Sequence, residues 1–138
     1  MKGYTRKIKL TIDKVEKVLK PVVIENLDQN KGKLQVEIAG EKIYALSDRY
    51  KTFFVKGYEC VNCGLKGSFF ALERNRDVTH NGTRYHLNLY AINEYGGEVL
   101  MTKDHILPKS KGGKNHLDNY QTMCINCNNK KGNTIVDH

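Results

Sequence analysis

Four cysteines in two C-x-x-C pairs constrain this chain more than any other feature. Cys60 and Cys63 form one pair, and Cys124 and Cys127 form the other. Two intervening residues let a tight turn direct both sulfurs of a pair toward one ion, and zinc takes four tetrahedral ligands. The sequence therefore predicts a closed, structural zinc site. The pairs stand about sixty residues apart, more than the usual ~12–20, so four thiols without a metal remain the alternative.

The chain also carries an excess of positive charge. Its 138 residues include 23 lysines and arginines against 15 aspartates and glutamates, which gives a formal charge of +8 and a pI near 9.3. An excess of this size favours a polyanionic partner such as nucleic acid. The alternative is an ordinary basic protein whose lysines are simply solvated.

No apolar run approaches the ~20 residues that span a bilayer, and no apolar signal segment follows the basic residues 1–7. We therefore expect no membrane partner and a cytoplasmic location, where thiols stay reduced and paired cysteines bind metal more readily than they form disulfides. The length suggests one main domain with a small N-terminal annex.

Residues 1–57 read as a β-rich accessory region of unknown role. Alternation of apolar and polar residues predicts a strand over 6–12, and the apolar spacing after Asp13 predicts a helix that Pro21 ends. Further patterns predict a strand at 22–24, a β-hairpin over 34–38 and 42–45, and a short helix over 47–54.

Residues 58–138 read as a second unit that contains all four cysteines. Apolar runs and alternation predict strands over 68–72, 84–91 and 98–102. A loop over 108–118 follows, and a last helix begins near Asn126.

This second unit resembles the HNH nuclease family, also called the ββα-metal nucleases. The resemblance covers roughly residues 58–133, and it is densest in these residues: Asp104, His105, Ile106, Pro108, Ser110, Gly112, Gly113, Asn119, Gln121 and 124–132. It implies an α+β fold, with a zinc-stapled ββα-metal core and the β-rich N-terminal region added to it. It also implies cleavage of phosphodiester bonds in nucleic acid, usually duplex DNA, to 5′-phosphate and 3′-hydroxyl ends.

Four residues carry the chemistry that such a hydrolysis needs. His105, as a neutral imidazole, can take a proton from the attacking water. Asp104 is a hard oxygen ligand suited to Mg²⁺ or Mn²⁺, and the amide oxygen of Asn128 can be the second ligand. The resemblance assigns Asn119 an indirect role, in which it holds the loop and orients His105. Neighbouring residues of a strand point to opposite faces, so Asp104 and His105 need a bend to share one site.

Lysines surround this motif, and we expect them to contact phosphates: Lys103, Lys109, Lys111, Lys114, Lys130 and Lys131. Gly112 and Gly113 would let the backbone approach the nucleic acid closely. Arg74, Arg76 and Arg84 are further candidates, and the basic N-terminal segment is either a second contact or a soluble helix.

The leading hypothesis is a divalent-metal-dependent DNA endonuclease of the small, stand-alone kind that resembles phage or mobile-element proteins, which would act in the bacterial host cell. One alternative is a zinc-stabilised DNA-binding protein without catalysis, which has no need of Asp104, His105 and Asn128. Another is a ribonuclease on the same scaffold. The N-terminal region could bind DNA, bind a partner or cover the sheet.

Overall fold

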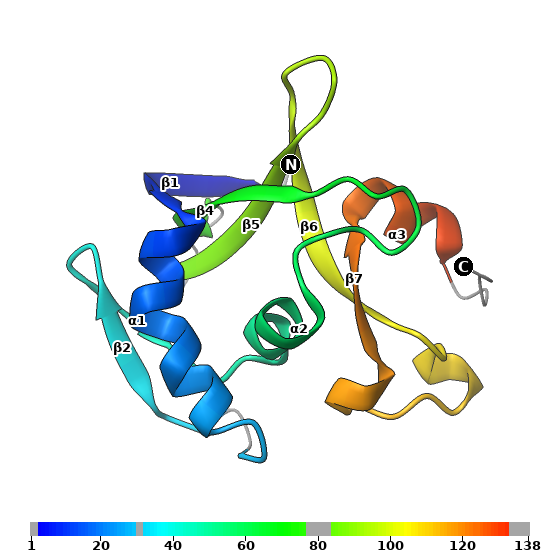
Figure 1. Cartoon of the computed structure of the whole chain (residues 1–138), viewed down its shortest axis with the longest axis horizontal. Coiled ribbons are helices and arrows are strands. Elements are labelled where there is room, and N and C mark those ends of the chain that lie inside the picture. The colour runs from blue at the N-terminus through cyan, green and yellow to red at the C-terminus, as the bar shows by residue number, and fades with distance from the viewer. Residues whose placement is uncertain (1–2, 30–31, 77–83, 133–138) are drawn as a thin grey trace.

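The computed structural model describes residues 3–29, 32–76 and 84–132. Its larger sheet is antiparallel and has the strand order β1-β4-β5-β6-β7 (Figure 1). Those strands are β1 (Tyr4–Thr11), β4 (Gly67–Asn75), β5 (His86–Ile92), β6 (Glu98–His105) and β7 (Tyr120–Cys124). With three α-helices in the described residues, the chain has the mixed α+β fold that its sequence indicates.

A separate two-stranded sheet is formed by β2 (Gln35–Ile38) and β3 (Glu41–Tyr44). The two-residue turn between them uses Ala39 at φ 49° and Gly40 at φ 82°. Positive φ at both central residues twists a hairpin in the direction that its strands require. The predicted hairpin is therefore confirmed.

The first helix is longer than the sequence predicts. α1 (Ile12–Glu25) begins after Thr11, whose hydroxyl accepts a hydrogen bond from the Lys14 N–H at 3.2 Å, and it continues through Pro21. Val15, Leu19 and Val23 are fully buried along one stripe. Burial of that stripe on both sides of the proline outweighs the ~3 kcal/mol that a proline costs inside a helix. The predicted helix end at Pro21 and the predicted strand at 22–24 are wrong.

The helices occupy both faces of the large sheet. α1 and α2 (Asp48–Lys56) cover the face that carries Phe70, Leu72 and Leu89. α3 (Ile125–Lys131) lies against the opposite face at the β6–β7 end, because its side chains bond to Thr102 and Asp104 of β6. No helix of the described residues is long and apolar enough to cross a membrane.

The strands predicted at 68–72, 84–91 and 98–102 are confirmed as β4, β5 and β6, and the last helix is confirmed as α3. The sequence analysis missed β7. All five of its residues are buried, so the alternation that reveals a half-buried strand is absent. The predicted loop over 108–118 contains two short 3₁₀ turns, η1 (Lys109–Lys111) and η2 (Leu117–Asn119).

The N-terminal region shares the main sheet. β1 pairs with β4 from Tyr4↔Asn75 to Thr11↔Phe69, with a shift of register between Arg6 and Ile8. α2 bridges two distant strands, since Arg49 donates to the Leu87 carbonyl of β5 and Lys56 donates to the Tyr120 carbonyl of β7. The N-terminal residues therefore help to build the surface on which the C-terminal motif lies.

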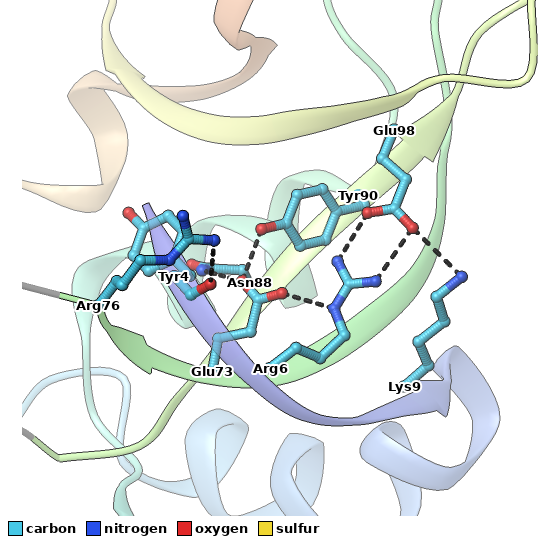
Figure 2. Close-up of polar contacts among 8 residues, drawn as sticks. All are labelled: Tyr4, Arg6, Lys9, Glu73, Arg76, Asn88, Tyr90 and Glu98. Atoms are coloured by element: carbon cyan, nitrogen blue, oxygen red, sulfur yellow. Dashed lines mark hydrogen bonds and ion pairs between the residues drawn. The ribbon is translucent and has the colours of Figure 1, made fainter. Parts of the chain in front are cut away.

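A polar network crosses the open face of the sheet (Figure 2). Glu73 is only 2 % exposed, and its carboxylate accepts hydrogen bonds from Arg6 Nε at 2.7 Å, Asn88 Nδ2 at 2.8 Å and the Tyr90 hydroxyl at 2.6 Å. The Arg6 guanidinium also bonds to both carboxylate oxygens of Glu98, at 2.7 and 3.0 Å. Arg6 thus holds three strands together and compensates the buried charge of Glu73.

We expect Arg6→Met to lower the free energy of unfolding by about 3 kcal/mol, because it leaves the buried Glu73 carboxylate without its cation. Lys7→Met is the matched control, since the Lys7–Glu41 pair is exposed and worth under about 1 kcal/mol. Urea unfolding followed by circular dichroism measures both. Equal losses for the two variants would contradict this role of Arg6.

Candidate metal centres and active site

The two cysteine pairs meet in space. The four sulfurs of Cys60, Cys63, Cys124 and Cys127 all lie within 4.8 Å of one another, and the Cys63 and Cys124 sulfurs are 3.8 Å apart. Sulfurs bound at about 2.3 Å to a tetrahedral ion are separated by roughly 3.8 Å. The cluster therefore has the dimensions of a closed zinc site, and the long separation of the pairs in the sequence does not prevent it.

Backbone hydrogen bonds hold this sulfur cluster in place. The first pair lies on a tight knuckle in which the Gly64 N–H donates to the Cys60 carbonyl, with Gly64 at φ 80°. The Val61 N–H donates to the Thr122 carbonyl, which joins the knuckle to β7. The second pair begins α3, where the Cys127 N–H donates to the Cys124 sulfur at 3.4 Å. The cluster thus links the knuckle, β7 and α3.

The thiols differ in acidity. Burial opposes ionisation of Cys60, but hydrogen bonds from the backbone of Cys63 and Cys124 outweigh it and lower the pKa of Cys60 to about 7. Burial raises the pKa of Cys124 to about 12. Because a metal binds thiolates, protons must leave such a cluster when the metal enters.

Asp104 and Asn128 lie on facing elements. Asp104 is on β6, only 7 % exposed, and Asn128 is on α3 directly after Cys127. Asn128 Nδ2 donates to Thr102 Oγ1 at 2.8 Å, and the Thr102 hydroxyl donates in turn to the Met123 carbonyl at 2.7 Å. These two hydrogen bonds fix the orientation of the amide, so Oδ1 is the atom of Asn128 that could hold a cation. Both residues line one hollow of about 310 Å³.

The Asp104 carboxylate already has two donors. Gln121 Nε2 lies 2.9 Å from its Oδ2, and the buried Lys131 ammonium lies 3.0 Å from the same oxygen. Lys131 Nζ also donates to the His105 carbonyl at 2.7 Å, so it joins the end of α3 to the end of β6. The other Asp104 oxygen and the Asn128 amide oxygen are of the kind that a hard cation takes as ligands.

The His105 side chain is held on the other side of β6. Its ring meets the Tyr120 ring edge to face at 5.1 Å, and its Nε2 lies 2.8 Å from Asn115 Oδ1. An amide oxygen only accepts hydrogen bonds, so Nε2 of the neutral ring carries the hydrogen and Nδ1 is the basic nitrogen. Tyr120 donates to Asp48 Oδ2 of α2 at 3.2 Å, which connects the imidazole to the N-terminal region. Burial, with Asp48 beside it, raises the pKa of Tyr120 to about 12.

Two hollows adjoin His105. The residue lines the 310 Å³ hollow together with Asp104 and Asn128, and it also lines a larger one of about 860 Å³ with Asn115 and Asp48. Alternation along β6 explains this double position, because Asp104 points toward α3 and His105 toward the α2 side. The structure therefore gathers the three residues at one strand end but directs the carboxylate and the imidazole to different faces.

Asn119 holds the loop that precedes β7. Its Oδ1 accepts from the Leu107 N–H at 2.9 Å, and its Nδ2 donates to the carbonyls of Leu107 at 3.1 Å and Lys114 at 2.9 Å. Lys114 precedes Asn115, the partner of His105. Gly113 has a related role, because a Cβ there would lie 1.8 Å from the Leu107 carbonyl oxygen. The close approach that this glycine permits is therefore to the chain's own backbone.

The lysines around the motif fall into two groups. Four are exposed, namely Lys109, Lys111, Lys114 and Lys130. Lys131 is only 4 % exposed and forms an ion pair with Asp104. The half-buried Lys103 places its ammonium 4.3 Å from the centroid of the Tyr120 ring. Lys131 therefore differs from its exposed neighbour Lys130, since successive helical residues point about 100° apart and this one points into the sheet.

The sequence named Gln121 in the resemblance but gave it no role, and it did not reveal four other residues that support the site: Thr102 and Asn115 as hydrogen-bond partners, and Tyr120 and Asp48 as supports of the imidazole. Thr102 was detectable, because it lies two residues before Asp104 on the same strand face. Asn115 and Asp48 were not, because their contacts depend on how a loop and a distant helix pack.

Comparison with known proteins bears on the C-terminal motif alone. Residues 94–138 match the family model described as HNH endonuclease, a segment that contains Asp104, His105, Asn119 and Asn128 but not the first cysteine pair. Searches of curated proteins and of solved structures found no match. The match confirms the resemblance seen in the sequence: residues 94–138 match the HNH endonuclease family, which supports a nuclease activity in general.

Proposed function

We propose that this protein is a divalent-metal-dependent DNA endonuclease that hydrolyses phosphodiester bonds to 5′-phosphate and 3′-hydroxyl ends. The observation that carries the proposal is that Asp104, His105 and Asn128 all line one hollow, inside the segment that matches the HNH endonuclease model. A non-catalytic DNA-binding protein has no need for a carboxylate, an amide oxygen and an oriented imidazole at one strand end.

His105 is the general base of the proposed reaction. Its Nδ1 takes the proton of the attacking water, while Asn115 keeps the hydrogen on Nε2 and Tyr120 limits rotation of the ring. Asn119 acts indirectly, because it holds the loop that presents Asn115. Phosphate placed between His105 and Asp104 would be attacked from the imidazole side.

Asp104 and Asn128 are the proposed ligands of one Mg²⁺ or Mn²⁺ ion. When bound, such an ion neutralises charge on the phosphate and stabilises the leaving 3′ oxygen. Lys131 keeps the Asp104 carboxylate oriented, and Thr102 keeps Oδ1 of Asn128 directed at the same hollow. A single carboxylate leaves room for phosphate and water in the coordination shell.

Zinc is the proposed ion of the four-cysteine cluster. Its role is mechanical, because four thiolate ligands leave no open position for a substrate. α3 has seven residues, too few to be stable by itself in water, and zinc would fix its first turn to the knuckle and β7. The position of Asn128, one residue after Cys127, would depend on this ion.

Cys127→Ser should release zinc and lower the melting temperature by about 10 °C or more, because metal binding supplies folding free energy in a small domain. Metal content by atomic absorption and thermal melting with and without a chelator give the measurement. The exposed Asn126→Ser, which leaves the four sulfurs intact, is the control. Unchanged zinc content in Cys127→Ser would show that this thiol is no ligand.

His105→Ala should reduce plasmid nicking by at least about a hundredfold in Mg²⁺ or Mn²⁺ without loss of zinc, since general-base catalysis typically contributes 10²–10⁴-fold. Supercoiled plasmid and a structured RNA are incubated with the parent and the variant. Equal nicking by both would remove His105 from the mechanism. Cleavage of RNA alone would favour the ribonuclease, and binding without cleavage in either metal would favour the non-catalytic protein.

Asn115→Ala should slow cleavage by about tenfold or more, because the His105 ring loses the partner that fixes its tautomer. Folding should be little affected, since Asn115 is exposed. Asn129→Ala, on the exposed side of α3, is the matched control. Single-turnover rates at saturating protein measure the effect, and a normal rate for Asn115→Ala would mean that the contact does not matter for catalysis.

A further inference from the structure

The cations of β1 are neutralised by carboxylates. Arg6 bonds to Glu73 and Glu98, and Lys9 Nζ lies 3.2 Å from Glu98 (Figure 2). Lys7 Nζ lies 2.6 Å from Glu41. The open face of the sheet around β1 therefore offers little uncompensated charge to a polyanion, even though the sequence there is basic.

Two arginines, one near the end of β4 and one two residues before β5, are arranged differently. Arg74 Cζ lies 5.3 Å from the centroid of the Tyr85 ring, and Arg84 Cζ lies 4.3 Å from that of Tyr44 in β3. Both arginines are exposed. Within the part of the chain that the structure describes, neither forms an ion pair. These four residues form what we call the tyrosine–arginine patch.

Stacking prepares these arginines to bind phosphate. A guanidinium that lies over an aromatic face keeps its N–H groups directed outward in its own plane, and that fork matches the oxygens of a phosphate. The ring also restricts the side chain before binding, so less conformational entropy is lost when a ligand arrives. Solvated lysines have no such restraint.

The patch and the HNH motif lie on opposite sides of α2. The patch comes from β3, β4 and the two residues that precede β5, whereas Asp104, His105 and Asn128 come from β6 and α3. α2 connects the two sides, since Arg49 bonds to β5 and Lys56 bonds to β7 (Figure 1). A ligand that touches both must therefore be long, as a nucleic-acid duplex is.

We propose that the tyrosine–arginine patch is a second nucleic-acid contact, which binds the phosphate backbone of the substrate away from the bond that is cut. The proposal rests on the proposed function for the identity of the substrate. Arg74 and Arg84 contact phosphates, so the patch adds affinity and fixes the direction of the duplex without reading its sequence. It also gives residues outside the matched segment a role in substrate binding.

The test measures DNA binding by the full chain in a His105→Ala background, so that cleavage does not interfere. Fluorescence anisotropy of a labelled random duplex, recorded at several salt concentrations, compares Arg74→Gln/Arg84→Gln with Lys14→Gln/Lys17→Gln. The lysine pair removes the same charge from exposed positions of α1. Circular dichroism verifies that both variants are folded.

We expect the arginine variant to bind about tenfold or more weakly and to reduce the slope of log K against log salt by about 1.8, at ~0.9 for each lost phosphate contact. The lysine variant should keep the parental slope. Arg74→Lys/Arg84→Lys should restore most of the slope but less of the affinity, because the charge returns without the planar fork. Equal behaviour of the arginine and lysine variants would overturn the proposal.

Cleavage separates this proposal from the proposed function. With His105 restored, Arg74→Gln/Arg84→Gln should raise KM for a long duplex and leave kcat unchanged, since the patch lies away from the reacting bond. A duplex too short to pass α2 should be cut equally by the parent and the variant. If the parent protein binds DNA through the patch but never cleaves it, the nuclease proposal alone is refuted. If Arg74→Gln/Arg84→Gln cleaves the long duplex with an unchanged KM, the patch proposal alone is refuted.

Discussion

The four-sulfur cluster is the constraint on which the C-terminal architecture depends. It joins a knuckle at residues 60–64 to the start of α3, which are separated by about sixty residues of chain. Thr122 strengthens the same junction, because its carbonyl accepts from Val61 and its hydroxyl donates to the Gly57 carbonyl. A helix as short as α3 needs such an anchor to hold Asn128 opposite Asp104. In the proposed reaction the cysteines would therefore act through geometry, and not through contact with substrate.

The second constraint is the alternation of side chains along β6. Thr102 and Asp104 face α3, while Lys103 and His105 face the side of α2. The proposed cation ligands are thus supported by α3, and the proposed base is supported by Tyr120 and, through it, by Asp48 of the N-terminal region. The two halves of the site meet only where the strand ends, at the loop that Asn119 closes.

Local patterns in the sequence predicted the elements whose cause is local. Alternation revealed β2 and β3, and cysteine spacing predicted the sulfur cluster. The failures have tertiary causes: burial of Val23 carries α1 through Pro21, and complete burial of β7 hides its alternation. The same limit applies to the site. The types and the order of Asp104, His105 and Asn128 made them identifiable in the sequence. The partners that orient them were not identifiable, because a contact such as that of Asn115 depends on the conformation of the loop and not on a spacing in the sequence.

The positive charge that the surface offers to a ligand depends on which cations form ion pairs, and not on the net charge of +8. Lys131 lies within the motif but forms an ion pair with Asp104. The cations of β1 likewise form ion pairs with Glu73, Glu98 and Glu41. The exposed cations that remain near the motif belong to the loop around Lys109 and to Lys130. Across α2, the corresponding charge belongs to arginines that tyrosines hold in place. An ion pair largely cancels the field that a polyanion would feel. In the proposed complex, the exposed lysines and arginines outside the ion pairs, on the two sides of α2, would therefore attract the phosphate backbone.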